Sequence, residues 1–232
     1  MIASIHQPSY FPWLGLLDKI HKSDQFILLD TVQLNDNAFQ SRNIFLNKRS
    51  EVEYLSIPIA KKGYKEKSIR ELKTVDKRWQ KKHHGFIIAN YKKHPFFDEV
   101  YPTIESLFTK DYTFLVDILT DSMQMTQTLF DISTNVILAS DLKIDASLTK
   151  DDLVLAQLKV VKATTYLSGT GAKDYQDEKK FIKENILLEY QSFKHPQYKQ
   201  KNTNHFEVGL SALDIVFNLG QYESKKILES TV

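Results

Sequence analysis

Short apolar runs alternate along this chain with stretches in which apolar residues recur every three or four positions. The short runs predict buried strands, whereas the longer spacing is typical of amphipathic helices. The predicted core strands are residues 2–5, 26–29, 136–139, 164–168 and 186–190. The predicted helices are residues 14–20, 77–90, 96–108, 112–131, 149–160 and 211–220. This alternation predicts an α/β fold with a doubly wound, mainly parallel Rossmann-like sheet.

The N-terminal strand, helix and strand form the clearest unit of this pattern. A βαβ unit places its two strands parallel, with a right-handed crossover. His6 and Asp30 directly follow the two strands, so we expect both side chains at the same edge of the sheet. Two further strands are predicted, one over 53–58, near an edge because of its proline, and one over 69–74.

The stretch 77–131 holds successive helical patterns with no strand between them. We interpret it as a helical insert within a single α/β domain that spans residues 1–232, because a chain of this length can bury a large core as one unit. Ser211 is a candidate N-cap for the last helix, and Gly220 is its expected stop.

The segment from His6 to Gly15 reads His-Gln-Pro-Ser-Tyr-Phe-Pro-Trp-Leu-Gly. Its two prolines fix φ and push the residues before them toward extended conformations, so the turn is rigid before any ligand binds. Ligands of open α/β sheets bind beyond the carboxyl ends of strands, which makes this turn the first candidate site. The alternative is structural: His6 would only bond a buried carbonyl, and Trp13 would pack in the core. The candidate binding residues here are Gln7, Tyr10, Trp13 and, on the following helix, Lys19.

A second polar segment follows the second strand. Residues 30–43 are rich in amides and resemble the long polar loops that often carry function. Arg42 is the only arginine among the first 48 residues, and its planar guanidinium suits a phosphate or a carboxylate. It could equally tie the loop to a backbone carbonyl or to Asp30. The candidate site residues of this segment are Asp30, Gln33, Arg42 and Asn43.

A glycine-containing turn closes the strand 164–168. Gly169 and Gly171 stand between a strand and a helix, where they allow the backbone to approach a phosphate or another oxyanion. The third glycine of a dinucleotide fingerprint is absent, and a tight turn without any ligand is the alternative. Lys173 and Asp174 follow the glycines, where a ligand would be met.

Composition narrows the function classes. The chain carries 31 basic and 29 acidic residues, a net charge of +2, so no net field favours nucleic acid or an anionic membrane as a partner. There is no cysteine, which excludes disulfides, thiolate zinc sites and a cysteine nucleophile. No close His and Asp spacing predicts a metal site. Because no apolar run approaches about 20 residues and no signal-peptide pattern opens the chain, we expect a cytoplasmic protein without a membrane span.

Motifs spread over nearly the whole chain resemble the WbqC-like family, whose members begin with a His-Gln-Pro-x-Tyr-x-Pro-Trp-x-Gly stretch. The resemblance implies a role in cell-surface polysaccharide biosynthesis, because such proteins are associated with O-antigen and capsule pathways. It also adds His195, Tyr198 and Gln200 as candidate binding residues. The motifs are residues 6–15, 24–33, 39–43, 54–59, 166–171, 195–200 and 210–214.

The N-terminal unit also resembles nucleotidyltransferase-like Rossmann folds, including pantothenate-synthetase-type ligases. There too a strand leads into a proline-containing turn with His and Gly, and residues 171–176 match a Gly-x-Lys-Asp-x-Gln turn of those ligases. The resemblance implies ATP or another activated acyl donor as co-substrate. Their His-x-Gly-His signature is incomplete here, because Gly15 is followed by Leu16, and this departure argues against ATP.

The first functional hypothesis is a transferase or ligase of acyl-transfer type that modifies an amino sugar carried on a nucleotide. His6 would accept the ammonium proton, and Asp30 would orient His6 or receive the amine. Arg42, Lys19 and the glycine turn would hold phosphate or stabilise an oxyanion. The expected partners are a small-molecule nucleotide sugar and an acyl donor, and no oligomeric state is predicted.

The second hypothesis belongs to another class, a non-catalytic module that binds a sugar nucleotide or a glycan. The side chains that would stack on a sugar face are Tyr10, Phe11, Trp13 and Tyr198, and Asn, Gln and Asp side chains would bind its hydroxyl groups. Ligand binding that does not depend on pH near neutrality, without turnover of any acyl donor, would favour this hypothesis.

Overall fold

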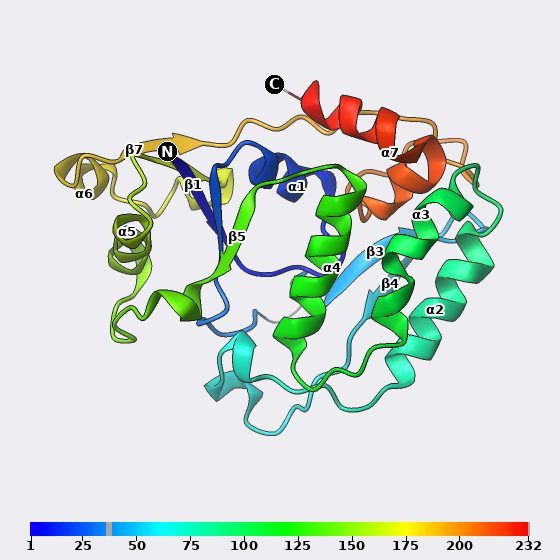
Figure 1. Ribbon diagram of the computed structural model, residues 1–232, viewed down its shortest axis with the longest axis horizontal. Helices are drawn as coiled ribbons and strands as arrows, with labels where there is room; N and C mark the ends of the chain where they lie inside the picture. The colour runs from blue at the N-terminus through cyan, green and yellow to red at the C-terminus, as the bar shows by residue number, and fades with distance from the viewer. Residues whose placement is uncertain (36–38, 232) are drawn as a thin grey trace.

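The computed structural model describes residues 1–35 and 39–231. Its centre is a five-stranded sheet in the order β5-β2-β1-β6-β7, in which every neighbouring pair is parallel (Figure 1). This confirms the expected α/β class, the mainly parallel sheet and the five core strands. The strands are β1 (Ile2–His6), β2 (Gln25–Leu28), β5 (Asn135–Leu138), β6 (Thr165–Ser168) and β7 (Leu187–Tyr190).

The strand order reverses at β1. In chain order, β2 and β5 extend the sheet to one side of β1, and β6 and β7 extend it to the other. The pairing of β1 with β2 continues to His6, which faces Leu28, but the pairing of β1 with β6 stops at Ala3, which faces Tyr166. The carboxyl ends of β1 and β6 therefore separate. Ligands of open parallel sheets bind at such a reversal, in the crevice outside the strand ends.

Alternate strand residues enter two separate hydrophobic cores, one on each face of the sheet. Phe26 and Leu28 of β2 belong to one core, and Ile27 between them belongs to the other, because successive side chains of a strand point to opposite faces. Both faces are thus covered, as in a doubly wound sheet. The first face is covered by α1 (Leu14–His21), α4 (Leu115–Leu129) and α7 (Leu213–Glu229), and the second by α5 (Lys150–Val160) and α6 (Glu178–Lys183).

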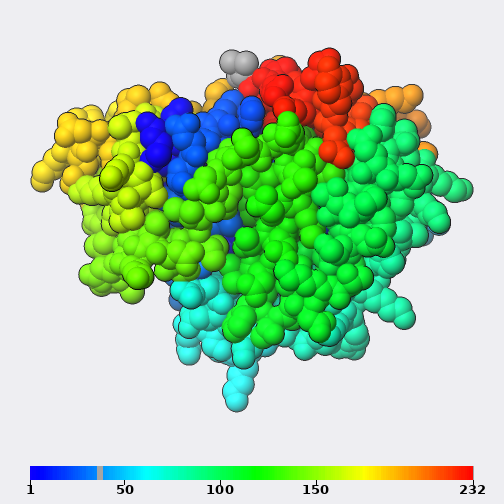
Figure 2. All heavy atoms as spheres, in the orientation of Figure 1, coloured from blue at the N-terminus to red at the C-terminus, as the bar shows by residue number. Residues whose placement is uncertain are grey.

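The connection from β2 to β5 is long. A separate antiparallel hairpin, β3 (Arg42–Leu46) and β4 (Val52–Ser56), comes first. The helices α2 (Arg78–Tyr91), α3 (Phe97–Ile104) and α4 follow, all inside the range 77–131 expected for the helical insert. In the space-filling view this segment forms most of the visible face, and little of the N-terminal unit reaches the surface there (Figure 2). The single-domain organisation of the chain stays a prediction.

In this connection one strand prediction was wrong and one strand was missed. Residues 69–74 do not form a strand; a 3₁₀ turn, η2 (Ile69–Glu71), stands there, and Ser68 and Glu71 cap it reciprocally. The strand β3 was not expected at all, because its first residues are polar and continue the composition of the loop before it. Residues 36–38 of that loop lie outside the described residues.

Of two helix ends in the structure, one differs from expectation and one agrees with it. The helix predicted over 96–108 is α3 followed by a 3₁₀ turn, η3 (Glu105–Phe108). The helix predicted over 211–220 does end at Gly220, whose φ of 79° and ψ of 171° are not helical; α7 consists of two helices joined across this residue. A Cβ at this glycine would lie 2.7 Å from the ring of Phe96, so close packing as well as backbone conformation requires glycine.

No helix among the described residues is long and apolar enough to cross a membrane.

Candidate functional site

A cavity of about 570 Å³ opens where the ends of β1 and β6 separate. Five of the predicted site residues line it: His6 at the end of β1, Gln7 after it, Lys19 on α1, and Gly169 and Gly171 after β6. The volume is typical of small-molecule sites. The fold thus brings the N-terminal turn and the glycine turn to one cavity. Other polar or aromatic residues that line it are Asn35, Gln40, Lys150, Asp151, Tyr166, Ser168, Tyr175 and Gln176.

The imidazole of His6 has one ring nitrogen available as a base. Nδ1 lies 2.8 Å from the Gln7 carbonyl oxygen. Because a carbonyl can only accept, Nδ1 carries the proton and donates it, which leaves the lone pair on Nε2. His6 is exposed to solvent, but the protein around the ring desolvates the imidazolium and so lowers the pKa of His6. The positive charge of Lys19 lowers this pKa further. His6 is therefore a neutral base at pH 7.

Lys19 places a buried cation in the cavity wall. Only 3% of the residue is exposed. Its Nζ donates to the Ile5 carbonyl oxygen at 3.0 Å, a carbonyl that lies beyond the last pairing of β1 with β6. Burial lowers the pKa of Lys19 to about 8, so the ammonium form still predominates at pH 7. Within the described part of the chain none of the ion pairs involves Lys19. An anionic ligand would stabilise this charge.

A pair of amide side chains forms another part of the wall. Gln40 Nε2 donates to Gln7 Oε1. Gln40 is 8% exposed, and its own Oε1 has no hydrogen-bond partner in residues 1–35 and 39–231. A buried acceptor left unpaired costs about 1–3 kcal/mol. A ligand O–H or N–H group in the cavity would remove that cost.

The turn after β6 leaves room for a ligand. Ser168 Oγ donates to Gln176 Oε1 at 3.0 Å and holds the turn closed. A Cβ at Gly169 or Gly171 would meet no atom within 4 Å, and neither glycine has a left-handed φ. Neither folding nor packing requires glycine at these two positions, so the open space beside them is available to a bound molecule.

A smaller cavity of about 220 Å³ adjoins the first one and shares His6, Lys19 and both turn glycines with it. Its far wall is aromatic. The ring of Trp13, a residue 39% exposed, meets the ring of Phe193 edge-on, with ring centres 5.4 Å apart. Aromatic faces beside a polar cavity suit the apolar face of a sugar ring.

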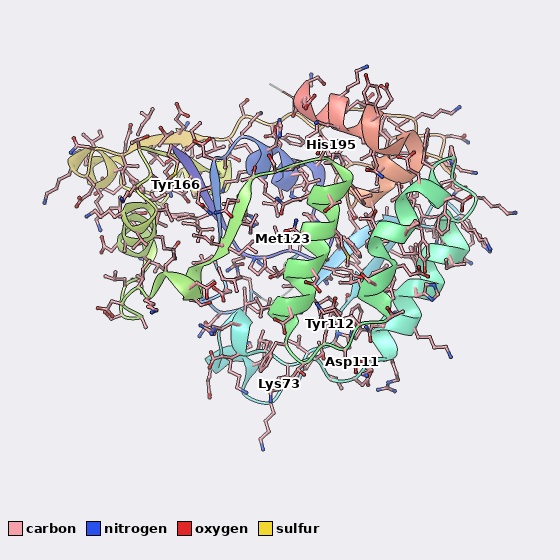
Figure 3. All side chains as sticks on the ribbon, viewed as in Figure 1. Lys73, Asp111, Tyr112, Met123, Tyr166 and His195 are labelled. Atoms are coloured by element: carbon pink, nitrogen blue, oxygen red, sulfur yellow. The ribbon has the colours of Figure 1, made fainter. Side chains whose placement is uncertain are left out.

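The glycine that ends the N-terminal motif is required by this aromatic wall. A Cβ at Gly15 would lie 2.2 Å from the Trp13 ring, so no side chain fits there. The ring of His195 stacks near Trp13, with centres 6.4 Å apart and an interplanar angle of 21°, and it lies on the side of the molecule near α1 and α7 (Figure 3). His195 supports Trp13 rather than lining either cavity.

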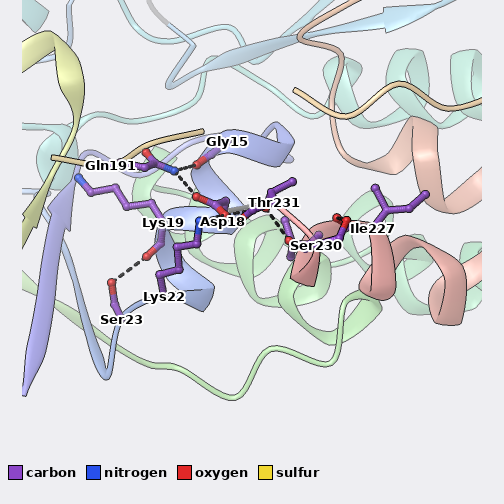
Figure 4. A network of polar contacts seen from close by, with 10 residues as sticks. Gly15, Asp18, Lys19, Lys22, Ser23, Gln191, Ile227, Ser230 and Thr231 are labelled. Carbon is purple, nitrogen blue, oxygen red and sulfur yellow. Dashed lines mark hydrogen bonds and ion pairs between the residues drawn. The ribbon is translucent and has the colours of Figure 1, made fainter. Parts of the chain in front are cut away.

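A polar network holds the floor of the smaller cavity (Figure 4). Gln191, which lines that cavity, donates from Nε2 to the Gly15 carbonyl and to Asp18 Oδ2, both at 2.7 Å. The buried Asp18 carboxylate also accepts from Thr231 Oγ1 at 2.8 Å and pairs with Lys22 at 2.7 Å. The carboxylate of Asp18 on α1 thus binds side chains from the segment after β7 and from the C-terminal residues.

Three predicted residues of the polar loop lie away from His6. Asp30 emerges at the same sheet edge, as expected, but it is 1% exposed and lines a different cavity of about 540 Å³. The guanidinium of Arg42 lies over the Tyr54 ring, 4.4 Å from its centre. Gln33 lines a second large cavity, of about 650 Å³, beside the first. The structure therefore does not bring Asp30 or Arg42 into the cavity that holds His6.

Tyr10 and Asn43 lie in the core behind the N-terminal turn. Tyr10 is 0% exposed, and its hydroxyl is hydrogen-bonded to His83 Nδ1 at 2.9 Å. Asn43 Nδ2 donates to the carbonyls of Tyr10 and the next residue at 3.1 and 2.6 Å. Met123 of α4 accepts from the backbone of the same turn at 3.3 Å (Figure 3). These residues position the turn, and the Tyr10 ring is not available to stack on a sugar.

Tyr198 and Gln200 belong to a buried network around Asp214. The hydroxyls of Tyr198 and Tyr91 donate to the two Asp214 oxygens at 2.8 and 3.2 Å. Asn218 Nδ2 donates to the same carboxylate at 3.2 Å, and Gln200 Nε2 donates to the Tyr198 hydroxyl at 3.3 Å. Burial raises the pKa of Asp214 to about 6. This network, which we call the Asp214 network, lies within the core.

Lys173 and Asp174 follow the glycine turn but line neither the cavity at His6 nor its smaller neighbour. Lys173 Nζ lies 5.9 Å from the centre of the Tyr190 ring. The sequence pattern missed Gln176, although it completes the Gly-x-Lys-Asp-x-Gln turn and that motif could have identified it. Lys150 and Asp151 at the start of α5 carry no motif and become visible only in the fold. No group of three or more side chains among the described residues is placed to hold a metal ion.

Comparison with known proteins agrees with the motifs. The model of the WbqC-like protein family matches residues 7–226. Uncharacterized protein Rv1507c of Mycobacterium tuberculosis is 27% identical over 221 residues, which cover 94% of this chain and 93% of that relative. No solved structure matches. With a family match over nearly its whole length, the chain belongs to the WbqC-like protein family.

Proposed function

We propose that this protein is a transferase or ligase of acyl-transfer type that forms an amide on an amino sugar carried by a nucleotide, in surface polysaccharide biosynthesis. One observation carries the proposal. A neutral His6, with Nδ1 bound to a backbone carbonyl, lies in a cavity that also holds the buried Lys19 cation and the open glycine turn. A base and an anion-stabilising group within one small-molecule cavity are the two elements that amide formation needs.

The residues of this cavity divide the reaction between them. The neutral amine of the sugar attacks the carbonyl carbon of the activated acyl group, the new C–N bond forms, and the leaving group departs with its bonding electrons. His6 Nε2 accepts the proton that the amine loses. The Lys19 ammonium and the backbone N–H groups of the glycine turn stabilise the negative charge on the carbonyl oxygen and on the leaving group. Trp13 and Phe193 provide a face for the sugar ring.

The reversal of strand order supports a nucleotide-linked substrate, because doubly wound sheets bind such ligands in the crevice outside the strand ends that begins at this point. The ends of β1 and β6 separate there, and the cavity fills the gap. The nucleotidyltransferase-like character of the N-terminal unit is part of this proposal. Asp30 and Arg42 have no role in it, since their side chains lie outside the cavity.

A non-catalytic module that binds nucleotide sugars is the second candidate. It is favoured by the aromatic wall of Trp13 and Phe193 and by the unpaired Gln40 acceptor, which serve binding without any chemistry. The two candidates differ in proton transfer, because only the enzyme needs His6 to change its protonation during turnover.

The test is to incubate the full-length protein with nucleotide-linked amino sugars and acyl donors, and to search for the amide by mass spectrometry. UDP- and dTDP-linked amino sugars, each with acetyl-CoA or with a carboxylic acid plus ATP, form the panel. We expect the mass of one sugar to increase by the acyl group less one hydrogen, and the product to be absent with His6→Gln although the sugar still binds. Tight binding of the sugars with no product at any pH would reject the enzyme and support the non-catalytic binding module.

A further inference from the structure

The cavity at His6 is one half of a longer crevice. The second cavity, of about 650 Å³, lies beyond the ends of β2 and β5. The two cavities share the lining residues Gln7, Val32, Asn35, Lys150 and Leu153. A single elongated ligand can therefore occupy both halves.

A buried wall of the second cavity carries an unpaired acceptor. Gln157 of α5 is 1% exposed and lines the cavity, and its Oε1 has no hydrogen-bond partner among the described residues. Most buried polar side chains in folded proteins are paired. An N–H or O–H donor on a ligand would complete this pairing.

The exposed part of the second cavity's lining is cationic. Arg70, Lys143 and Lys150 line it, against the single carboxylate of Asp145. Asp145 Oδ1 already accepts a backbone N–H bond at 2.9 Å. The excess positive charge there favours an anionic group, and phosphate oxygens suit such a cluster.

The helix α5 sets the distance between these two features. Lys150 begins α5 and Gln157 lies seven residues further on, about 10 Å along the helix axis. Leu153 lies between them in the sequence, and all three residues line the cavity. Val32, Ile144 and Leu148 extend this apolar wall. These groups suit a nucleotide. An apolar surface and a hydrogen-bond acceptor would bind the base, the cations would bind the phosphates, and the ribose would lie between them.

We propose that the second cavity binds the nucleoside diphosphate half of the nucleotide sugar. The phosphates lie at Lys143 and Lys150, the base packs on the apolar wall, and a base N–H donates to Gln157 Oε1. The sugar then enters the first cavity beside Gln7 and His6. This inference deepens the proposed function, but its test measures binding alone, so a failure of acyl transfer would leave it standing.

The test is calorimetric titration of the full-length protein with UDP, dTDP, GDP and ADP, and with inorganic pyrophosphate and the free nucleoside of the best diphosphate. We expect Gln157→Leu to weaken binding of the best diphosphate and of its nucleoside about five- to tenfold, the effect of one lost hydrogen bond, and to leave pyrophosphate binding unchanged. The double variant Lys143→Gln with Lys150→Gln should weaken the diphosphate and pyrophosphate at least about tenfold and reduce the salt dependence of both.

Lys162→Gln is the matched control. Lys143, Lys150 and Lys162 all have left-handed φ, of 52°, 51° and 58°, so the three substitutions share the same backbone cost and charge change, and Lys162 does not line the cavity. The lysine variants are at exposed positions and keep the test valid if Gln157→Leu does not fold. Failure of all four diphosphates to bind, or losses in the single variants Lys143→Gln and Lys150→Gln no larger than in the control, would overturn the proposal. Unchanged diphosphate affinity in a folded Gln157→Leu protein would do the same.

Discussion

The cavity at His6 and the Asp214 network both contain Gln, Tyr and charged side chains, yet they differ in how their polar atoms are paired. In the Asp214 network both carboxylate oxygens accept hydrogen bonds from buried donors. In the cavity, the Gln40 acceptor has no partner among the described residues and Lys19 has only a neutral carbonyl. Paired polar groups specify and stabilise a core, whereas unpaired groups beside open space are prepared for a ligand. We therefore expect substitutions in the two regions to affect different measurements.

The largest effect is expected at His6. Replacing the imidazole by an amide in His6→Gln removes the base, and loss of a general base lowers kcat by about 100- to 10,000-fold. The free energy of unfolding should change little, because His6 is exposed and its ring bonds the carbonyl of the adjacent residue. Steady-state kinetics and urea unfolding measure the two quantities. His205→Gln is the control, since this exposed histidine pairs only with Glu207 at 2.9 Å; equal losses of kcat in both variants would contradict the role of His6.

The Asp214 network should appear in stability as a function of pH. The folded-state pKa of Asp214 is raised from 3.8 to about 6 by burial, so the fold favours the protonated acid. Its contribution is fully present below pH 3.8 and is lost as pH rises through about 6, by on the order of 3 kcal/mol. The difference in unfolding free energy between wild type and Asp214→Asn, measured by urea titration from pH 4 to 8, should show this slope. A difference that does not vary with pH would show that the carboxyl titrates normally.

Alanine substitutions at two glycines should separate an effect on stability from an effect on ligand binding. Gly15→Ala places a Cβ inside the Trp13 ring and should destabilise the fold by about 1–3 kcal/mol or more. Gly171→Ala places a Cβ in open space and should leave the melting temperature almost unchanged while weakening nucleotide-sugar binding about tenfold. Thermal unfolding and calorimetric titration separate the two outcomes. Undiminished ligand affinity in Gly171→Ala would mean that the turn does not contact the ligand.

The smallest effect is expected for Tyr198→Phe. The substitution removes one hydroxyl that donates to Asp214 at 2.8 Å and leaves the ring in place. We expect a loss of about 1 kcal/mol in unfolding free energy and no change in nucleotide-sugar affinity, since Tyr198 lines neither cavity of the crevice. A loss of nucleotide-sugar affinity without a loss of stability would show that Tyr198 belongs to the binding site.

Local sequence patterns predicted the core strands and the parallel βαβ unit, because each depends on the periodicity of neighbouring residues. They failed at β3, where polar residues begin a strand whose partner lies further along the chain, and at 69–74, where the reciprocal cap of Ser68 and Glu71 favours a 3₁₀ turn. Of the candidate site residues, His6, Gln7, Lys19 and the turn glycines line one cavity, and their role in binding stays a prediction.

The sequence by itself determined the strand and helix composition, the rigid turn from His6 to Gly15 and the family, since these follow from residue type and short-range spacing. Only the tertiary structure decided which polar residues share a cavity. Asp30 and His6 end adjacent parallel strands, yet their side chains enter different cavities, while Lys150 and Gln157 join the crevice without any sequence motif. The physical reason is that side-chain direction and burial depend on the packing of elements distant in sequence, which local spacing does not encode.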